Sequence, residues 1–203
     1  MSTVKSKKLQ VGTDATSSNN FTIYQPATPD GTLRIGVGNA DSPTEVGRFN
    51  NNGYVATNAP AFSAYMSGDQ SISTSTWTKV QFNSELFDTD NCFDSTTNYR
   101  FTPTVAGYYQ INFRSRTIGT SSTATYYSIY KNGSATGINS AALATNAGFQ
   151  SMQTVSGIIY CNGSTDYIEF YANNNGTSPF IDAAGGSDLG NTTTVDGVLV
   201  RAA

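Results

Sequence analysis

The stretch YRFTPTVAGYYQINFR, residues 99–114, decides the fold that we expect for this chain. From Tyr109 to Arg114, apolar and polar residues alternate one by one. Successive side chains of a β-strand point to opposite faces, so this alternation predicts a strand with one buried face and one face in water.

The same kind of pattern recurs along the rest of the chain. Short runs of Val, Ile, Thr, Tyr and Phe are separated by clusters of Gly, Asn, Asp and Ser, at the roughly 8–12 residue spacing of a sandwich or barrel. The pairs Asn132-Gly133 and Asn162-Gly163 are typical of tight hairpin turns. No segment sustains helical periodicity, and we expect the alanine-rich residues 141–147 to form a strand or loop. The sequence therefore predicts an all-β fold.

Composition excludes several functional classes. The chain has 203 residues and no histidine, which removes Ser-His-Asp and Cys-His catalysis and every His-ligated metal site. Its net charge of −3, without a basic stripe, argues against nucleic-acid binding. No stretch approaches the roughly 18 consecutive apolar residues of a membrane span. We expect a protein that is not an enzyme, has no resident cofactor and is not inserted in a membrane.

A domain boundary is expected near residues 51–60. Residues 1–58 are rich in Gly, Asn and Asp and contain weak strands around Leu9–Val11, Phe21–Tyr24 and Leu33–Val37. So short a region buries too little surface for a core of its own. We expect it to pack on a symmetry mate, on the main domain or on a larger particle, whereas residues 59–203 form one all-β domain.

The second region resembles the C1q-like, tumour-necrosis-factor-like jelly roll. Five segments carry the resemblance in the family's order: Ala61–Tyr65, Val80–Asn83, Tyr99–Tyr109, Ile129–Gly133 and Asp196–Val200. One departure is the loop Asn162–Asp166, which is longer than the family's usual Gly-Asp turn. The resemblance implies a sandwich of about ten strands. It also implies a homotrimer that buries aromatic side chains around a threefold axis.

The abundance of tyrosine fits such a trimer. The chain contains 12 tyrosines, more than we expect one monomer core to hold. At a subunit interface a tyrosine buries its ring and keeps its hydroxyl hydrogen-bonded. Stacking on a ligand is the alternative use. The candidates for the trimer interface are Tyr108, Tyr109, Tyr127 and Tyr171.

The first region resembles β segments of tail-fibre and other virion proteins of tailed phages, at Asn20–Thr22, Pro29–Leu33 and Gly38–Ala40. Residues 1–58 would then be a virion attachment or oligomerisation region that binds a capsid or tail adaptor protein. Met1–Val11 has lysines but no apolar core of a signal peptide, so we expect synthesis in the host cytoplasm and release by lysis.

The two resemblances imply a non-enzymatic virion surface protein of the tail-fibre or head-fibre type. Its expected task is adhesion to a glycan or protein of the host surface, through loops at residues 119–125 and 173–190. The alternative is a capsid decoration or cement protein that stabilises the head lattice. A third hypothesis is a cell-encoded, lectin-like protein.

Acidic residues offer two further candidate sites. Alternating oxygen ligands suit calcium, although an ordinary turn is the other interpretation, and the candidates are Asp88, Asp90 and Asp94. The only glutamates are Glu45, Glu85 and Glu169, so a glycosidase pair would need an Asp such as Asp166 or Asp182 as partner. We expect Glu169 instead to be a solvated carboxylate on the outward face of a strand.

Two other features stay open at the level of sequence. Trp77 either stacks on a sugar ring or packs at the start of a strand. Cys92 and Cys161 are the only cysteines, and their contexts do not decide whether they form a disulfide.

Overall fold

The computed structural model describes residues 8–16, 19–56, 59–121, 124–143, 150–183 and 190–203. The described residues form strands, turns and loops without an α-helix, so the all-β prediction is confirmed. No helix in this part of the chain is long and apolar enough to cross a membrane. The chain divides into two compact units, Met1–Asn58 and Ala59–Ala203.

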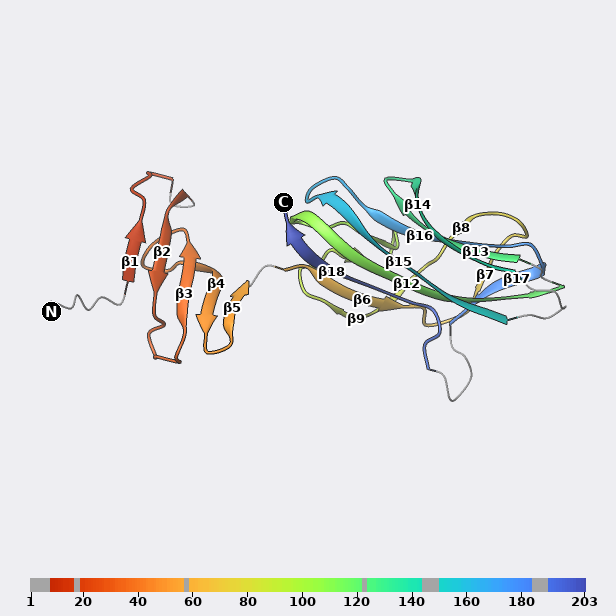
Figure 1. Cartoon of the computed structure of the whole chain (residues 1–203), viewed down its shortest axis with the longest axis horizontal. Helices are drawn as coiled ribbons and strands as arrows, with labels where there is room; N and C mark the ends of the chain where they lie inside the picture. Colours follow the sequence, from red (N-terminus) through yellow and green to blue (C-terminus); the bar gives the residue numbers. More distant parts are fainter. Residues whose placement is uncertain (1–7, 17–18, 57–58, 122–123, 144–149, 184–189) are drawn as a thin grey trace. The chain divides into compact units, whose positions relative to one another are not determined.

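The first unit is a five-stranded antiparallel meander, drawn in red to orange in Figure 1. Each strand pairs with the next one in the sequence, from first to last. The strands are β1 (Lys8–Val11), β2 (Phe21–Tyr24), β3 (Leu33–Val37), β4 (Thr44–Asn50) and β5 (Gly53–Ala56).

The second unit contains a seven-stranded sheet built around β12, whose fifteen residues continue the decisive stretch of sequence (Figure 1). β15 pairs along one edge of β12, and β17 and β18 share the other edge. The strands are β6 (Ala61–Tyr65), β7 (Gln70–Ser71), β9 (Ser84–Asp88), β12 (Ala106–Thr120), β15 (Gln150–Asn162), β17 (Thr177–Asp182) and β18 (Thr194–Ala202).

A six-stranded sheet forms the other layer of the second unit. Its path runs β10-β11-β16-β13-β14, and β8 pairs with β16 beside that path. The strands are β8 (Thr78–Lys79), β10 (Phe93–Asp94), β11 (Arg100–Phe101), β13 (Ala124–Lys131), β14 (Ser134–Leu143) and β16 (Ile168–Asn174).

Aromatic side chains from the two sheets meet in one core. Phe62 of β6 stacks on Phe101 of β11, with ring centroids 4.4 Å apart. Phe113 of β12 meets Tyr127 of β13 edge to face at 5.7 Å and Phe170 of β16 at 5.4 Å. All five side chains are fully buried. The unit is therefore a two-layer sandwich with the jelly-roll architecture expected from the sequence.

Of the two tight hairpin turns predicted from Asn-Gly pairs, one is present and the other is replaced by a wider loop. Asn132 and Gly133 both have positive φ, 52° and 75°, which is the backbone of a two-residue hairpin between β13 and β14. Asn162 does not form such a turn. Its side-chain Oδ1 accepts hydrogen bonds from the backbone N–H groups of Ser164, Thr165 and Asp166, so a wider loop leads to β16.

The alanine-rich segment is only partly described. Ala141, Ala142 and Leu143 end β14, as expected for a strand, whereas the rest of residues 141–147 lies outside the described residues.

Candidate functional site

The outer face of the seven-stranded sheet carries a row of exposed apolar side chains. Tyr109 and the other odd-numbered residues of β12 point into the core, so the even-numbered ones point outward. Strand register places Tyr160 opposite Tyr108, and both Ile158 and Val198 opposite Gln110. The exposed fractions lie between 42 and 57% for Tyr108, Tyr160, Ile158, Val198 and Val200.

A chain of neutral and acidic side chains continues this face. The Gln110 Nε2 donates to the Ser156 Oγ at 2.7 Å, and that hydroxyl donates to the Asn112 Oδ1 at 2.7 Å. The Asn112 Nδ2 in turn donates to the Asp196 Oδ2 at 2.6 Å. These bonds join the four side chains to one another beside the apolar row.

This combination has the chemistry of a protein interface. Interface cores are enriched in aromatic side chains and depleted of charged ones. The rings of Tyr108 and Tyr160 lie 5.4 Å apart and together offer a broad apolar platform whose hydroxyls still form hydrogen bonds with water or a partner. We call the outer surface of Tyr108, Gln110, Ile158, Tyr160 and Val198 the assembly face.

The tyrosine candidates separate into two groups. Tyr108 lies on the assembly face. Tyr109 and Tyr127 are fully buried within the single chain, so their prediction as interface residues is wrong. Their hydroxyls donate to the Val105 carbonyl oxygen at 2.6 Å and to the Thr117 Oγ1 at 2.8 Å, which satisfies both groups inside the core. Tyr171 lies on the other sheet, where its ring contacts Tyr130 at 4.1 Å.

Burial also sets the protonation of the two core tyrosines. Desolvation raises the pKa of Tyr127 to about 12 and also raises the pKa of Tyr109. Both therefore stay neutral hydrogen-bond donors at any physiological pH, and neither is available to a partner.

The N-terminal sheet has an apolar face as well. Register pairs Leu9 with Ile23, Val11 with Phe21 and Leu33 with Phe49, and paired residues of neighbouring strands share a face. The exposed fractions lie between 37 and 59% for Leu9, Val11, Phe21, Ile23, Leu33 and Phe49. The described residues of the first unit therefore cover this row only in part.

A cluster of charged side chains in the first unit lies apart from that row. The Arg34 Nη1 lies 3.1 Å from the Glu45 Oε2, and the Arg48 Nε lies 2.6 Å from the Glu45 Oε1. Arg34 also pairs with Asp30. Arg34 and Arg48 are paired across β3 and β4; Arg34 directly follows Leu33, and Arg48 directly precedes Phe49. Because successive side chains of a strand point to opposite faces, both arginines lie on the face opposite the apolar row.

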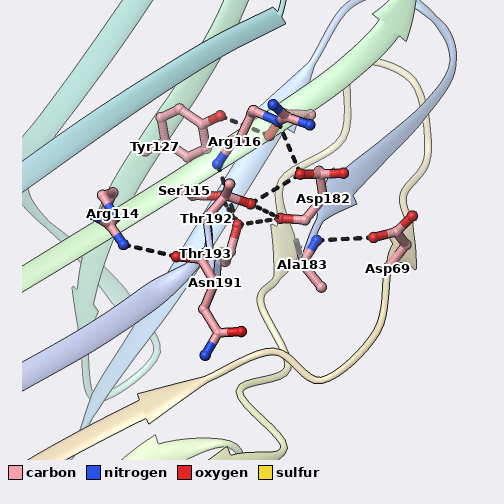
Figure 2. A network of polar contacts seen from close by, with 11 residues as sticks. Asp69, Arg114, Ser115, Arg116, Tyr127, Asp182, Ala183, Asn191, Thr192 and Thr193 are labelled. Atoms are coloured by element: carbon pink, nitrogen blue, oxygen red, sulfur yellow. Dashed lines mark hydrogen bonds and ion pairs between the residues drawn. The ribbon is translucent and has the colours of Figure 1, made fainter. Parts of the chain in front are cut away.

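A buried polar network holds one end of the sandwich (Figure 2). The Arg116 Nε lies 2.9 Å from the Asp182 Oδ2, and Thr192 and Thr193 donate their hydroxyls to Asp182. The Thr192 N–H also donates to the Ala183 carbonyl oxygen at 2.9 Å. These contacts tie together both ends of the connection between β17 and β18. The segments predicted as receptor-contacting loops, 119–125 and 173–190, are largely strand where the structure describes them, because they include the end of β12, the start of β13, the end of β16 and all of β17. To that extent the loop prediction is wrong, and residues 122–123 and 184–189 lie outside the described residues.

The carboxylates proposed for a glycosidase pair are each neutralised by a different cation. Glu169 is buried and pairs with Lys79, so its prediction as a solvated carboxylate is wrong. Asp166 lies 2.8 Å from the Lys131 Nζ, and Asp182 pairs with Arg116. Such arrangements stabilise the fold and leave none of the three as a paired acid and base.

Two of the candidate calcium residues, Asp88 and Asp94, accept backbone N–H groups of their own loop, and the Asp90 Oδ2 accepts the Thr104 hydroxyl at 3.2 Å. The Asp88 Oδ2 accepts the Phe93 N–H at 2.7 Å. Asp94 accepts N–H groups from Thr97, Thr96 and Asn98, and these bonds lower the pKa of its carboxyl group well below its usual range. In the part of the chain that the structure describes, no three acidic or thiol side chains gather to hold a metal ion. The turn interpretation accounts for the contacts observed.

The structure also shows the surroundings of Trp77 and of the two cysteines. Trp77 is 40% exposed and lies between Tyr126 and Tyr130 on the outer face of the six-stranded sheet. Cys92 and Cys161 are free, buried thiols. Burial raises the pKa of both, that of Cys161 to about 11.

Comparisons with known proteins find similarity only among solved structures. No protein-family model matches the chain, and no curated protein matches it. The globular domain of zebrafish complement 1qA protein is 17% identical, covers 71% of this chain and 99% of its own, and has a TM-score of 0.44. PRD1 vertex protein P5 is also 17% identical, over 71% of this chain and 98% of its own, with a TM-score of 0.47.

The Eiger TNF of S. frugiperda is 9% identical to this chain. It covers 71% of this chain and 93% of its own, with a TM-score of 0.49. These neighbours include the C1q and TNF types that the sequence resembles, and the fold assignment itself rests on the strand order and the core described above.

Proposed function

We propose that this chain is a non-enzymatic, homotrimeric surface protein of a phage virion, whose second unit assembles through the assembly face. The observation that carries the proposal is the row of exposed apolar side chains aligned across β15, β12 and β18. Contiguous apolar patches on a protein surface mark sites of interaction. A neighbouring copy of the chain covers that row in the assembled protein.

Three copies are the number that the C1q-like and TNF-like resemblance implies. When one surface of a protomer binds a different surface of the next protomer, repetition of that contact forms a closed ring if each step rotates by a whole fraction of a full turn, which is one third for a trimer. Beyond β18, the sheet continues with β6 and ends at β9, whose Leu86 and Phe87 are 66 and 50% exposed. We propose that this edge of one protomer covers the assembly face of the next.

The N-terminal sheet completes the trimer in this proposal. Once three sandwiches assemble, their N-terminal sheets are held at a high effective concentration. The apolar row that includes Leu9, Phe21 and Phe49 then packs against the same row of the other two copies. The rest of the first unit contacts a capsid or tail adaptor protein, as its resemblance to virion proteins implies.

We infer that the task of the assembled protein is adhesion to a host surface. Three identical heads multiply a weak contact into a strong one without any new interaction. The ends of the sandwich supply loops on a rigid scaffold, which is where binding residues concentrate.

Electron microscopy of intact particles labelled with an antibody against the full chain tests this assignment. Label on a fibre or knob at the particle surface is the expected result. Particles without surface label would contradict a virion role. Label spread over the head lattice, together with no binding of the purified chain to host cells, would replace adhesion by capsid decoration.

A further inference from the structure

We propose that the second unit binds a neutral sugar ring in a hollow on the outer face of the six-stranded sheet, between Trp77 and β14. This inference rests on the proposed adhesion function and names its ligand class. The hollow has a volume of about 280 Å³. Its lining residues are Trp77, Tyr126, Ser128, Tyr130, Ala135, Asn139 and Ser140.

Strand pairing explains why these residues meet. Tyr126 and Tyr130 lie four residues apart on β13 and therefore share a face, with Ser128 between them. Strand β16 lies between β8 and β13, and its Ala172 is paired with both Thr78 of β8 and Tyr127 of β13. Trp77 directly precedes Thr78, so this pairing places it near β13. On the other side, β14 places Asn139 opposite Ser128.

The three aromatic rings form two inclined walls. The Trp77 ring centroid lies 6.4 Å from that of Tyr126 and 6.3 Å from that of Tyr130, at interplanar angles of 54° and 57°. Tilted rings at this separation leave part of each π face uncovered, and Trp77 stays 40% exposed. The C–H groups on one face of a sugar ring are apolar and can pack against the exposed faces of these aromatic rings.

The walls are held in place before any ligand arrives. Tyr130 packs against Tyr171, with centroids 4.1 Å apart. The loop before Trp77 is tied to the end of β16, because the Ser75 N–H donates to the Asn174 carbonyl oxygen at 2.8 Å. The Thr74 hydroxyl donates to the Gly176 carbonyl oxygen at 2.8 Å. A preformed site loses little conformational entropy on binding.

The polar groups of the hollow indicate a neutral ligand with hydroxyl groups. Ser128, Asn139 and the tyrosines supply hydroxyls and an amide, and no Asp, Glu, Lys or Arg is among the lining residues. Charged residues on the neighbouring strands of this sheet pair with each other, Lys79 with Glu169 and Lys131 with Asp166. Aromatic cages also suit quaternary ammonium ions, but without a lining carboxylate the neutral ring is the better match.

Size and position agree with this ligand. Pockets for drug-sized ligands measure roughly 300–1,000 Å³, so the hollow suits one ring of a longer glycan. It lies on the layer of the sandwich opposite the assembly face. Trimer formation therefore leaves three such sites free, and their multiplicity offsets the weak affinity of each one.

Fluorescence tests the proposal directly, because Trp77 is the only tryptophan of the chain. We would titrate the full chain with maltotriose, cellotriose and N,N′-diacetylchitobiose, and with choline chloride as the cationic probe. The expected result is a saturable change of tryptophan emission with at least one of the saccharides. A response to choline alone, or no response to any saccharide, would overturn the proposal.

A filling variant separates the hollow from a general effect on the fold. Ala135 is exposed and lines the hollow, so Ala135→Phe occupies it without disturbing the core. We expect saccharide affinity to fall at least tenfold in this variant. Ala27→Phe makes the same change at an exposed position of the first unit and should leave the affinity unchanged. A saccharide response that survives in Ala135→Phe would refute the assignment of the site.

Light scattering on the same samples distinguishes this inference from the proposed assembly. A trimer that binds no saccharide overturns the sugar site and leaves the assembly standing. A monomer that binds saccharide through Trp77 supports the site and overturns the assembly.

Discussion

The substitution Ile158→Asp should dissociate the trimer while leaving each sandwich folded. Ile158 is 57% exposed in the single chain, so the proposed assembly is what buries the rest of its side chain. Complete burial of an isoleucine contributes about 1.5–3 kcal/mol, and the exposed share therefore contributes about 0.9–1.7 kcal/mol per protomer. Three symmetric copies bring this to about 3–5 kcal/mol per trimer.

The introduced carboxylate adds to this loss, because an unpaired charge in an interface also costs desolvation energy. We therefore expect the trimer association constant to fall at least a hundredfold. Sedimentation equilibrium over a concentration series measures that constant. Thermal unfolding in parallel reports whether the sandwich itself stays intact.

Leu143→Asp is the matched control. Leu143 ends β14 and is 75% exposed, but it lies outside the assembly face, so this variant should associate like the unmodified chain. An Ile158→Asp variant whose association constant stays within threefold of that of the unmodified chain would refute the placement of the interface.

Three further predictions concern the stability of the sandwich. Asp182→Asn leaves Arg116 without its buried counter-ion and should lower the free energy of unfolding by about 3 kcal/mol in urea denaturation; a loss below half a kilocalorie would show that the pair is dispensable. Gly107→Ala should cost more than Gly157→Ala in the same assay, because the new Cβ would lie 2.4 Å from the backbone oxygen of Arg201 in the first case and 2.6 Å from the flexible end of Ile138 in the second. The buried Cys161 thiol binds its proton more tightly in the folded state than in the unfolded state, where its pKa is about 9.0. Its contribution to stability is therefore complete below pH 9 and is lost as the pH rises towards the folded-state pKa of about 11. In Cys161→Ala, the free energy of unfolding measured by denaturation should change less between pH 9 and pH 11 than in the unmodified chain.

Local patterns of the sequence predict the strands well because side-chain alternation and turn chemistry act between neighbours. The stretch 99–114 leads into β12, and Asn132-Gly133 forms the expected hairpin. The first three weak strands of the N-terminal region are present, whereas β4 and β5 were not predicted. Gly47 within β4 and Gly53 at the start of β5 hide the apolar alternation there.

The site depends on pairing between distant segments, which no local pattern specifies. Alternation alone places Tyr108 and Tyr109 on opposite faces, yet only the register with β15 and β18 shows which face stays exposed. The sequence analysis did not identify Ile158 as an interface candidate. Its place on the exposed face follows from its pairing with Gln110, a residue far away in the sequence. Glu169 is paired instead of solvated because β8 brings Lys79 beside β16.

Native mass spectrometry of the purified full chain at micromolar concentration tests the central claim most directly. The account predicts a complex of three chains, held by the assembly face and the apolar row of the N-terminal sheet. A single chain that remains monomeric and folded at that concentration would show that both surfaces tolerate water, and would contradict the account.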